Sequence, residues 1–407
     1  SSWPSSSRTG RGEWSRISLH PDATRHGHAI FCAYAIQFLV TAQQLTGRQS
    51  VERVLKWVAA AVVFMAVVAL AQFLAGTDKF LWIYEHPSRA ASGVVRGPFA
   101  NQNHLAHMLA LGVGPLVWWL CARAGGASEA GTRTAQRSAR DRRANQWWIA
   151  GLGIGVGLVL LAAVLTFSRA GVVAVLLAVA MALITLAWTG RLGQRGWAAA
   201  AVMATLLCVA LAVHGFDRWG ARIQTVVGAD SLSDVSSGRQ QVWSAVQRAV
   251  GEFPLLGSGV GTHRDVYPMY LDQYADVEYT HAESGYLQIL EEMGVVGLSL
   301  LLVAVGVVGN WCRIALLRAP SPHARLLAGA VTASLLVSAL HSLVDFVWYI
   351  PACMTITIVL AACMWRLSRL AMQDDPQSSV YRIPRPIYLS GAVAVSFTVL
   401  TVVALAW

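Results

Sequence analysis

Charged residues are scarce in this sequence, and their scarcity excludes an ordinary soluble protein. Only 13% of the 407 residues are Asp, Glu, Lys or Arg, whereas 56% are hydrophobic. Soluble globular domains carry about 25% charged residues. Cysteine is also rare, and its positions show neither the spacing of a metal site nor that of a disulfide framework. The six positions are Cys32, Cys121, Cys208, Cys312, Cys353 and Cys363.

Several motifs of enzyme and transport chemistry are missing as well. The sequence has no Asp-x-Asp pair, no Walker A loop and no Gly-x-Ser-x-Gly elbow, and its acidic residues lack the spacing of Mg²⁺ or Mn²⁺ ligands. It also has no pair of interrupted helices in matching halves. These absences disfavour a hydrolase, an ATPase and a classical transporter. We therefore expect chemistry without a metal or another cofactor.

Long apolar runs take the place of these motifs. Runs of about 17 to 23 residues recur along the chain, which is the length that an α-helix needs to cross a bilayer. They predict an all-α polytopic transmembrane bundle of about ten helices. The expected spans are residues 29–46, 54–75, 104–121, 147–167, 171–188, 197–213, 286–308, 326–347, 350–365 and 387–406.

Basic residues between the spans indicate the orientation. The connection 122–146 contains six arginines, so the positive-inside rule places it in the cytoplasm. The same rule accounts for the net charge of +10, and we expect no nucleic-acid partner. Alternation then divides the chain into a polar tail (1–28), helices 1–6 (29–214), a large extracytoplasmic loop (215–284) and helices 7–10 (285–407). The basic tail fits this orientation best if helices precede it, so we expect an N-terminal truncation.

The large loop is expected to contain short amphipathic helices. Val242, Val246, Val250 and Phe253 recur at helical spacing after Gly238, which predicts a helix that lies along the membrane interface. Pro254 and the glycine-rich run 257–261 end it, and a mobile turn is expected there. Four tyrosines follow as interfacial anchors or as an aromatic strip that faces substrate, namely Tyr267, Tyr270, Tyr274 and Tyr279.

Three residues of the outer face are candidates for catalysis. His281 lies where the loop re-enters the membrane, and a neutral imidazole there can accept a proton from a hydroxyl. Arg169 and Arg239 carry the forked donors that suit a diphosphate. Simpler interpretations remain open. His281 can be a polar residue at a helix start, Arg169 can reach lipid phosphate, and Arg239 can be solvated in the first turn of its helix.

Further polar residues accompany them on the same predicted face. Arg264 and Arg96 add positive charge, which favours an anionic, lipid-linked ligand over a neutral solute. Asn103 and Asp345 lie at predicted helix ends. Asp345 has three open roles, which are to neutralise an arginine, to orient a histidine and to cap a helix.

These residues lie in motifs that resemble the bacterial O-antigen ligase and polymerase superfamily of polytopic glycosyltransferases. The resemblance extends from about residue 97 to residue 367, and the order of its motifs is more specific than any one of them. The motifs are GPFANQN at 97–103, TFSRAG at 166–171, GR at 238–239 with Trp243, HAESGYLQILEEMG at 281–294 and HSLVDF at 341–346.

The resemblance implies a function. A glycan on undecaprenyl diphosphate would be moved to an acceptor hydroxyl at the outer face of the inner membrane, without metal or nucleotide sugar. Arg169 and Arg239 match the arginines that hold the diphosphate in the family, and His281 matches its proposed base. The expected substrate-binding residues are Arg169, Arg239, Arg264, Arg96, Asn103, Trp243, Tyr279, Glu283 and Asp345.

The acceptor is left open by one departure from the family pattern. Ligases of the family often have an Asn or a second His beside the loop histidine, whereas here His281 is followed by Ala282 and Glu283. Ligation to lipid A-core is the main expectation. O-antigen or exopolysaccharide polymerisation and protein O-oligosaccharyl transfer share the same motifs. A polysaccharide exporter and a structural protein represent other classes of function, and membrane lipid is a partner in each case.

Overall fold

The protein is an all-α polytopic membrane protein. Its structure, a computed structural model, describes residues 18–87, 89–133, 139–191, 239–272 and 278–373. Within these ranges the regular structure is helical, apart from two isolated β-bridges near residues 80–89. Seven of the described helices are long and apolar enough to cross a membrane. They are α2 (Arg48–Leu74), α3 (Gln102–Arg133), α4 (Ala139–Val164), α5 (Arg169–Trp188), α11 (Gly285–Leu317), α12 (Pro322–His341) and α13 (Pro351–Gln373).

Seven of the ten expected spans are thus found, in the expected order, as helices that are long and apolar enough to cross a membrane. The first expected span, 29–46, corresponds to α1 (Pro21–Gln44), which is helical but is not among those seven. The spans 197–213 and 387–406 lie outside the described residues, as does the first part of the large loop. The connection expected over 122–146 is mostly helical, because α3 continues to Arg133 and α4 begins at Ala139.

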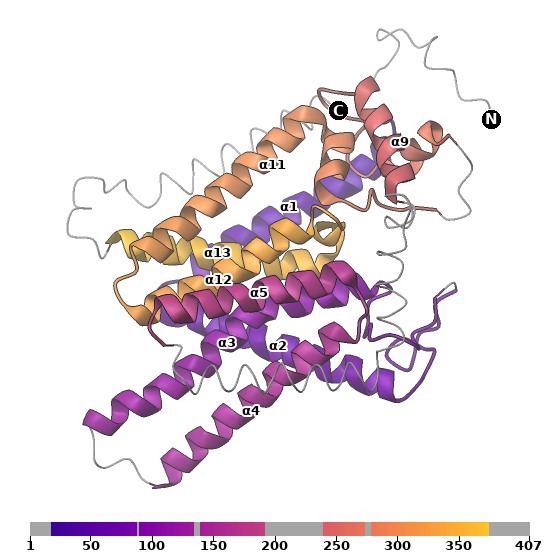
Figure 1. The fold of residues 1–407 in the computed structure, drawn as a ribbon. Coiled ribbons are helices and arrows are strands. Elements are labelled where there is room, and N and C mark those ends of the chain that lie inside the picture. Colours follow the sequence, from indigo (N-terminus) through magenta and orange to yellow (C-terminus); the bar gives the residue numbers. More distant parts are fainter. Residues whose placement is uncertain (1–17, 88, 134–138, 192–238, 273–277, 374–407) are drawn as a thin grey trace. The chain divides into compact units, whose positions relative to one another are not determined.

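The chain divides into two compact units. One contains the described residues 36–191 and 305–373, and its helices α3, α5 and α12 pack against one another and run side by side in Figure 1. Small residues permit this close packing. A Cβ atom on Gly114 of α3 would lie 2.3 Å from the Ala330 carbonyl oxygen of α12. A Cβ atom on Gly171 of α5 would lie 2.3 Å from the Ala106 methyl of α3.

The other unit contains residues 18–35, 239–272 and 278–304 of the described chain. Its helix α9 (Arg239–Glu252) begins and ends where the sequence predicts an amphipathic helix. That this helix lies along the membrane interface stays a prediction, but its apolar face does not contact lipid. Val242 and Val246 are fully buried and pack against Ala282, with Tyr279 and Leu287 beside them, so protein rather than lipid covers that face.

The segment after α9, where a mobile turn is expected, forms hydrogen bonds with a kink in α11. Helix α11 is kinked at Gly294, which has φ +64°, and the kink releases two carbonyls and two N–H groups from the helix. Residues 254–259 take up all four. Pro254 and Leu255 accept from the N–H groups of residues 295 and 296, at 2.9 and 3.2 Å. The N–H groups of Ser258 and Gly259 donate to the carbonyls of residues 291 and 292, both at 2.9 Å.

Candidate active site

His281 is held by a glutamine on the first turns of α11. Its Nδ1 lies 3.2 Å from Oε1 of Gln288, and the same oxygen accepts the N–H of Ala282 at 3.2 Å. The Gln288 amide nitrogen donates to Glu292 one helical turn further, at 3.0 Å. Because an amide oxygen only accepts, the proton of neutral His281 resides on Nδ1 and the lone pair on Nε2. A neutral imidazole in this form can accept a proton at Nε2.

Helix α9 positions Arg239 and Trp243 beside the same segment. Arg239 contacts Oε2 of Glu283 through Nε and through a terminal nitrogen, each at 3.1 Å. The indole N–H of Trp243 donates to the Ala282 carbonyl at 2.9 Å. Glu283 itself has φ +53°, a left-handed conformation that is uncommon for a residue with a side chain. These contacts join His281, Glu283, Arg239 and Trp243 into one cluster.

The tyrosines of this unit do not form a single strip. Tyr267 of the short helix η1 (Tyr267–Tyr270) is buried, and its hydroxyl accepts the N–H of Tyr279 at 2.8 Å. Tyr270 donates to Glu252 at 2.5 Å, and Tyr274 lies outside the described residues. Burial and the nearby charge of Glu283 raise the pKa of Tyr279. The prediction is therefore wrong for Tyr267, which is a core residue that supports Tyr279.

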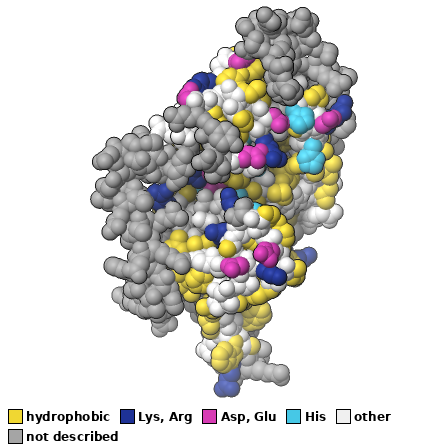
Figure 2. All heavy atoms as spheres, turned by 90° about the vertical axis from the view of Figure 1, so that its right-hand side faces the viewer, with side chains coloured by type: hydrophobic (Ala, Val, Ile, Leu, Met, Phe, Trp, Pro, Cys, Tyr) yellow, Lys and Arg dark blue, Asp and Glu magenta, His cyan; other side chains and the backbone are white. Residues whose placement is uncertain are grey.

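Arg264 lies in an exposed ion pair. It belongs to α10 (His263–Val266), and its guanidinium contacts both carboxylate oxygens of Glu278. Both side chains are more than half exposed. Paired charges of this kind are typical of the surface in Figure 2, where basic and acidic side chains lie beside one another among hydrophobic ones.

A buried pair that the sequence analysis missed braces the start of α11. Nδ1 of His263 lies 2.5 Å from Oε2 of Glu291, and both side chains are almost completely buried. The His263 ring stacks on Tyr267, with ring centroids 4.8 Å apart. Tyr267 in turn accepts the N–H of Tyr279, two residues before His281. The buried pair therefore supports the segment that carries His281 through Tyr267. The order of the residues along the chain contains no signal for a contact between positions 28 residues apart.

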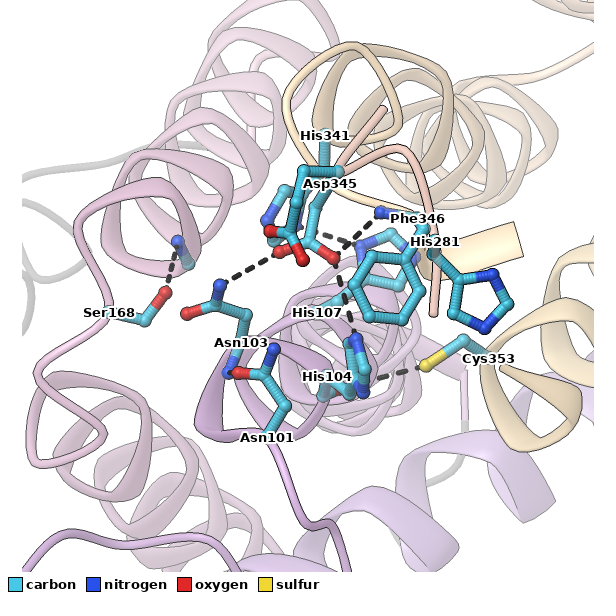
Figure 3. A network of polar contacts seen from close by, with 12 residues as sticks. Asn101, Asn103, His104, His107, Ser168, His281, His341, Asp345, Phe346 and Cys353 are labelled. Carbon is cyan, nitrogen blue, oxygen red and sulfur yellow. Dashed lines mark hydrogen bonds and ion pairs between the residues drawn. The ribbon is translucent and has the colours of Figure 1, made fainter. Parts of the chain in front are cut away.

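Asp345 is the centre of a polar network in the other unit (Figure 3). Its Oδ2 accepts from the Asn103 amide at 2.8 Å, and its Oδ1 accepts from the N–H of Phe346 at 2.8 Å and lies 3.4 Å from Nε2 of His104. Asp345 is fully buried. Of the roles left open by the sequence, these contacts support the orientation of a histidine.

The contacts of Asp345 explain why its carboxyl group is ionised. Burial by itself would raise the pKa of Asp345, but the hydrogen bond and charge of His104, the charge of His341 and the Asn103 amide outweigh burial. They hold the pKa of Asp345 at about 2. The carboxylate is therefore ionised at neutral pH. It gives this end of the α3 and α12 pair a fixed negative charge.

Two further histidines extend the network into the bundle. His107 of α3 and His341 of α12 face each other with their Nδ1 atoms 3.1 Å apart, and both are buried. Two imidazole nitrogens at this distance share one proton, because one must donate and the other accept. The polar network at the ends of these helices thus includes both rings, which no local sequence pattern indicates.

Arg169 is the first residue of α5. Ser168 caps this helix by accepting the N–H of Gly171 at 2.9 Å, and Phe167 before it has φ +51°. The N-terminus of a helix favours negative charge, and an arginine there adds a cation to that field. The position therefore suits an anionic group.

Arg96 contributes a second cation of the same unit. Its loop is anchored by the N–H of Val95, which donates to the Leu165 carbonyl at 3.0 Å. Burial, and then the charge of Arg89, lower the pKa of Arg96. Its Nε atom is buried and has no hydrogen-bond partner among the residues that the structure describes. A buried donor without a partner destabilises the folded protein, and an anionic ligand at this position would accept its hydrogen bond.

Within each unit the predicted residues fall into groups. The structure brings together His281, Arg239, Trp243 and Glu283 in one unit, and Asn103 with Asp345 in the other. In the described part of the chain, no group of three or more His, Cys, Asp or Glu side chains is placed to hold one metal ion. Gln288 is the most informative residue to which the sequence analysis gave no role.

A comparison of the sequence with protein families finds a match that includes these residues. Residues 154–302 match the family described as O-antigen ligase. This part of the chain is similar to O-antigen ligases. The matched region begins within α4 and ends within α11, so it includes Arg169, Arg239 and His281. The match confirms the resemblance and supports a glycosyltransferase-like class of enzyme that acts on lipid-linked glycans. No curated protein matches the sequence.

Proposed function

We propose that this protein transfers a glycan from undecaprenyl diphosphate to an acceptor hydroxyl at the periplasmic face of a bacterial inner membrane. The observation that carries the proposal is the contact of His281 with Gln288, which puts the proton-accepting lone pair of a neutral imidazole on Nε2. This contact lies within the region that is similar to O-antigen ligases. A histidine held in one tautomer is suited to act as a general base.

The proposed reaction is a single displacement with inversion. His281 takes the proton of the acceptor hydroxyl as its oxygen forms a bond to the anomeric carbon of the donor sugar. The bond from that carbon to the diphosphate oxygen breaks, and its electron pair leaves with undecaprenyl diphosphate. Negative charge therefore builds on the diphosphate. We expect the stabilisation of this charge by cations to contribute more to the rate than general-base catalysis by His281 does.

Arginines supply these cations in the proposal. Arg239 and Arg169 hold the diphosphate. The buried Nε of Arg96, which has no hydrogen-bond partner among the described residues, is a further observation in favour of an anionic ligand. Glu283 keeps the Arg239 guanidinium extended before the donor arrives. Trp243 fixes the backbone between His281 and Glu283. Asn103, which the buried Asp345 holds in place, contributes a polar contact to the acceptor in the proposal. The exposed Arg264 is a further candidate contact for the donor glycan.

The acceptor proposed first is lipid A-core, as in O-antigen ligation. Polymerisation of lipid-linked repeats and transfer to protein are the alternatives within the superfamily. The deciding experiment incubates the purified protein in lipid nanodiscs with an undecaprenyl-diphosphate-linked glycan and either lipid A-core or a second lipid-linked glycan. Extension of lipid A-core identifies a ligase, and extension of the second glycan identifies a polymerase. No product with either acceptor contradicts both assignments and favours export or protein glycosylation.

His281→Ala tests the mechanism in the same assay. We expect transfer to fall about 10³-fold, because general-base catalysis contributes about 10²- to 10⁴-fold. His26→Ala is the control, since His26 is an exposed histidine on α1. The control should transfer at the normal rate. Undiminished transfer by the His281 variant would exclude this residue as the base.

A further inference from the structure

We propose that Gln288 is a positioning residue that fixes the tautomer of His281. The expected effect on catalysis rests on the proposed function. The contacts of Gln288 with His281, Ala282 and Glu292 do not depend on that function. Gln288 is almost completely buried, on the first turns of α11, and its side chain has a contact at each of its two polar atoms. One atom faces His281 and Ala282, and the other faces Glu292.

The orientation of the Gln288 amide is determined from both sides. The backbone N–H of Ala282 requires an acceptor, so the amide oxygen must face it. The Glu292 carboxyl lies 3.0 Å from the other atom and accepts from the amide nitrogen. With the amide fixed in this way, only the N–H form of His281 Nδ1 makes a hydrogen bond to it. Glu292 is thereby joined to His281 through Gln288.

The surroundings of the amide add rigidity to this arrangement. The Ala282 peptide is held on its N–H side by Gln288 and on its carbonyl side by Trp243, at 3.2 and 2.9 Å. The nearby charges of Arg239 and Glu283 pair with each other. A buried polar side chain with fixed partners restricts its neighbour to one orientation. Gln288 therefore does for His281 what a carboxylate does for the histidine of a hydrolase, but without a charge.

Two substitutions test the proposal on the full-length protein in nanodiscs. Gln288→Glu keeps the shape and replaces the amide with a carboxylate, which stabilises the protonated imidazole. We expect the pH midpoint of His281 to rise by roughly one unit or more. Gln288→Leu removes the acceptor, so the midpoint should fall and kcat should drop about 10²-fold with little change in KM.

The pH midpoint is measured without any glycan substrate. Diethyl pyrocarbonate modifies neutral histidine, and mass spectrometry of the peptide that contains His281 gives its rate of modification at each pH. An unchanged midpoint in Gln288→Glu overturns the proposal, even if Gln288→Leu fails to fold. A shifted midpoint supports it. If His281→Ala remains active while the midpoint shifts, the proposed function fails and the positioning role stands.

A second inference concerns an exposed apolar turn, residues 80–84, which we propose inserts into the lipid headgroup region of the membrane. Trp82, Ile83 and Tyr84 are 47%, 85% and 56% exposed. The turn is ordered by hydrogen bonds between Phe80 and Tyr84 in both directions. Trp and Tyr are enriched at membrane interfaces, because their rings are apolar and their edges are polar.

The position of this turn argues for lipid as its partner. The N–H of Leu81 donates at 3.0 Å to the side chain of Gln72, which lies in the last turn of the candidate membrane span α2. The turn is therefore tied to the end of a membrane helix. Leu74, the last residue of that helix, is 79% exposed. Apolar side chains at this depth are covered when phospholipid surrounds them.

Fluorescence quenching in nanodiscs tests this inference. The emission of Trp82 is the difference between the wild-type protein and Trp82→Phe, and the quencher is a phospholipid brominated on the acyl chain near the headgroup. We expect quenching comparable to that of Trp57, which is 72% exposed on α2, and far above that of Trp118, which is 1% exposed. Quenching of Trp82 by aqueous acrylamide but not by the brominated lipid overturns the inference, as does quenching by neither.

Discussion

Arg239 contacts Glu283 through two nitrogens of its guanidinium, and this geometry determines what a conservative substitution does. Arg239→Lys keeps the positive charge but loses the planar fork of donors. Transfer should therefore fall about 10²-fold, by analogy with the loss of one donor to a developing negative charge. The assay is the transfer reaction in nanodiscs at saturating acceptor.

Arg248→Lys provides a matched control on the same helix. Arg248 pairs with Asp272 on the exposed surface, where ion pairs contribute little. Transfer and thermal stability should both stay near their wild-type values. Full activity of Arg239→Lys would argue against a bidentate contact with the diphosphate.

Asp345 predicts how stability depends on pH. Its pKa in the folded protein is about 2, below the ordinary value of 3.8. A lowered pKa contributes stability that is present above about pH 4 and is lost as the pH falls towards 2. The difference corresponds to about 2 kcal/mol. The stability difference between the wild type and Asp345→Asn should therefore be largest near neutral pH and shrink between pH 4 and pH 2.

Thermal unfolding in detergent at a series of pH values measures this difference. Asp272→Asn is the control, since the exposed ion pair of Asp272 with Arg248 should change stability little at any pH. A stability difference for Asp345→Asn that does not change between pH 7 and pH 2 would contradict the explanation.

Individual residues were predicted from the sequence where their chemistry was unusual for their place. Arginines and a histidine at the outer ends of apolar spans require a reason, and Arg239 and His281 accordingly lie in one hydrogen-bonded cluster with their neighbours. Gln288 carried no such signal. A glutamine near the start of a helix is ordinary, and between it and His281 lies Glu283, whose left-handed conformation local composition does not encode.

At the scale of the elements, the kink in α11 gives a direct prediction. A Cβ atom on Gly294 would lie 2.2 Å from the Leu255 carbonyl oxygen, and the residue has φ +64°. Gly294→Ala should therefore destabilise the protein by at least about 2 kcal/mol. Thermal unfolding in detergent measures the loss. Gly306→Ala on the same helix is the control, because nothing lies within 4 Å of its added methyl group.

The two variants should move stability in opposite directions. Alanine is the better helix former by about 1 kcal/mol, so Gly306→Ala should be neutral or slightly stabilising. If Gly294→Ala behaves like Gly306→Ala, the kink is not required by the contact with residues 254–259.

Elements were predicted best where a single physical requirement dominates. A membrane span must be long and apolar, and seven expected spans are helices with those properties. The amphipathic pattern of α9 was also correct as a helix, but the pattern specifies only that one face is covered. Lipid and protein cover an apolar face equally well, so the partner of Val242 and Val246 required the structure.

For the whole molecule, the sequence predicted the class of protein but not which spans are neighbours. Asn103 and Asp345 are 242 positions apart, and their hydrogen bond follows from the packing of α3 against α12. That packing depends on close approach at Gly114, which looks like any other glycine in an apolar run. The catalytic proposal likewise combines residues that are far apart along the chain.

The exchange of hydrogen bonds at the α11 kink limits how this chain can vary in length. Four backbone groups of residues 291–296 are matched one to one with residues 254–259, and the match is independent of the side chains involved. Inserting or deleting a single residue within 254–259 would offset the pairs on one side of the change relative to those on the other. Substitutions are tolerable there wherever a side chain fits, but changes in length are not. Length variation among related chains should therefore be concentrated elsewhere in the loop.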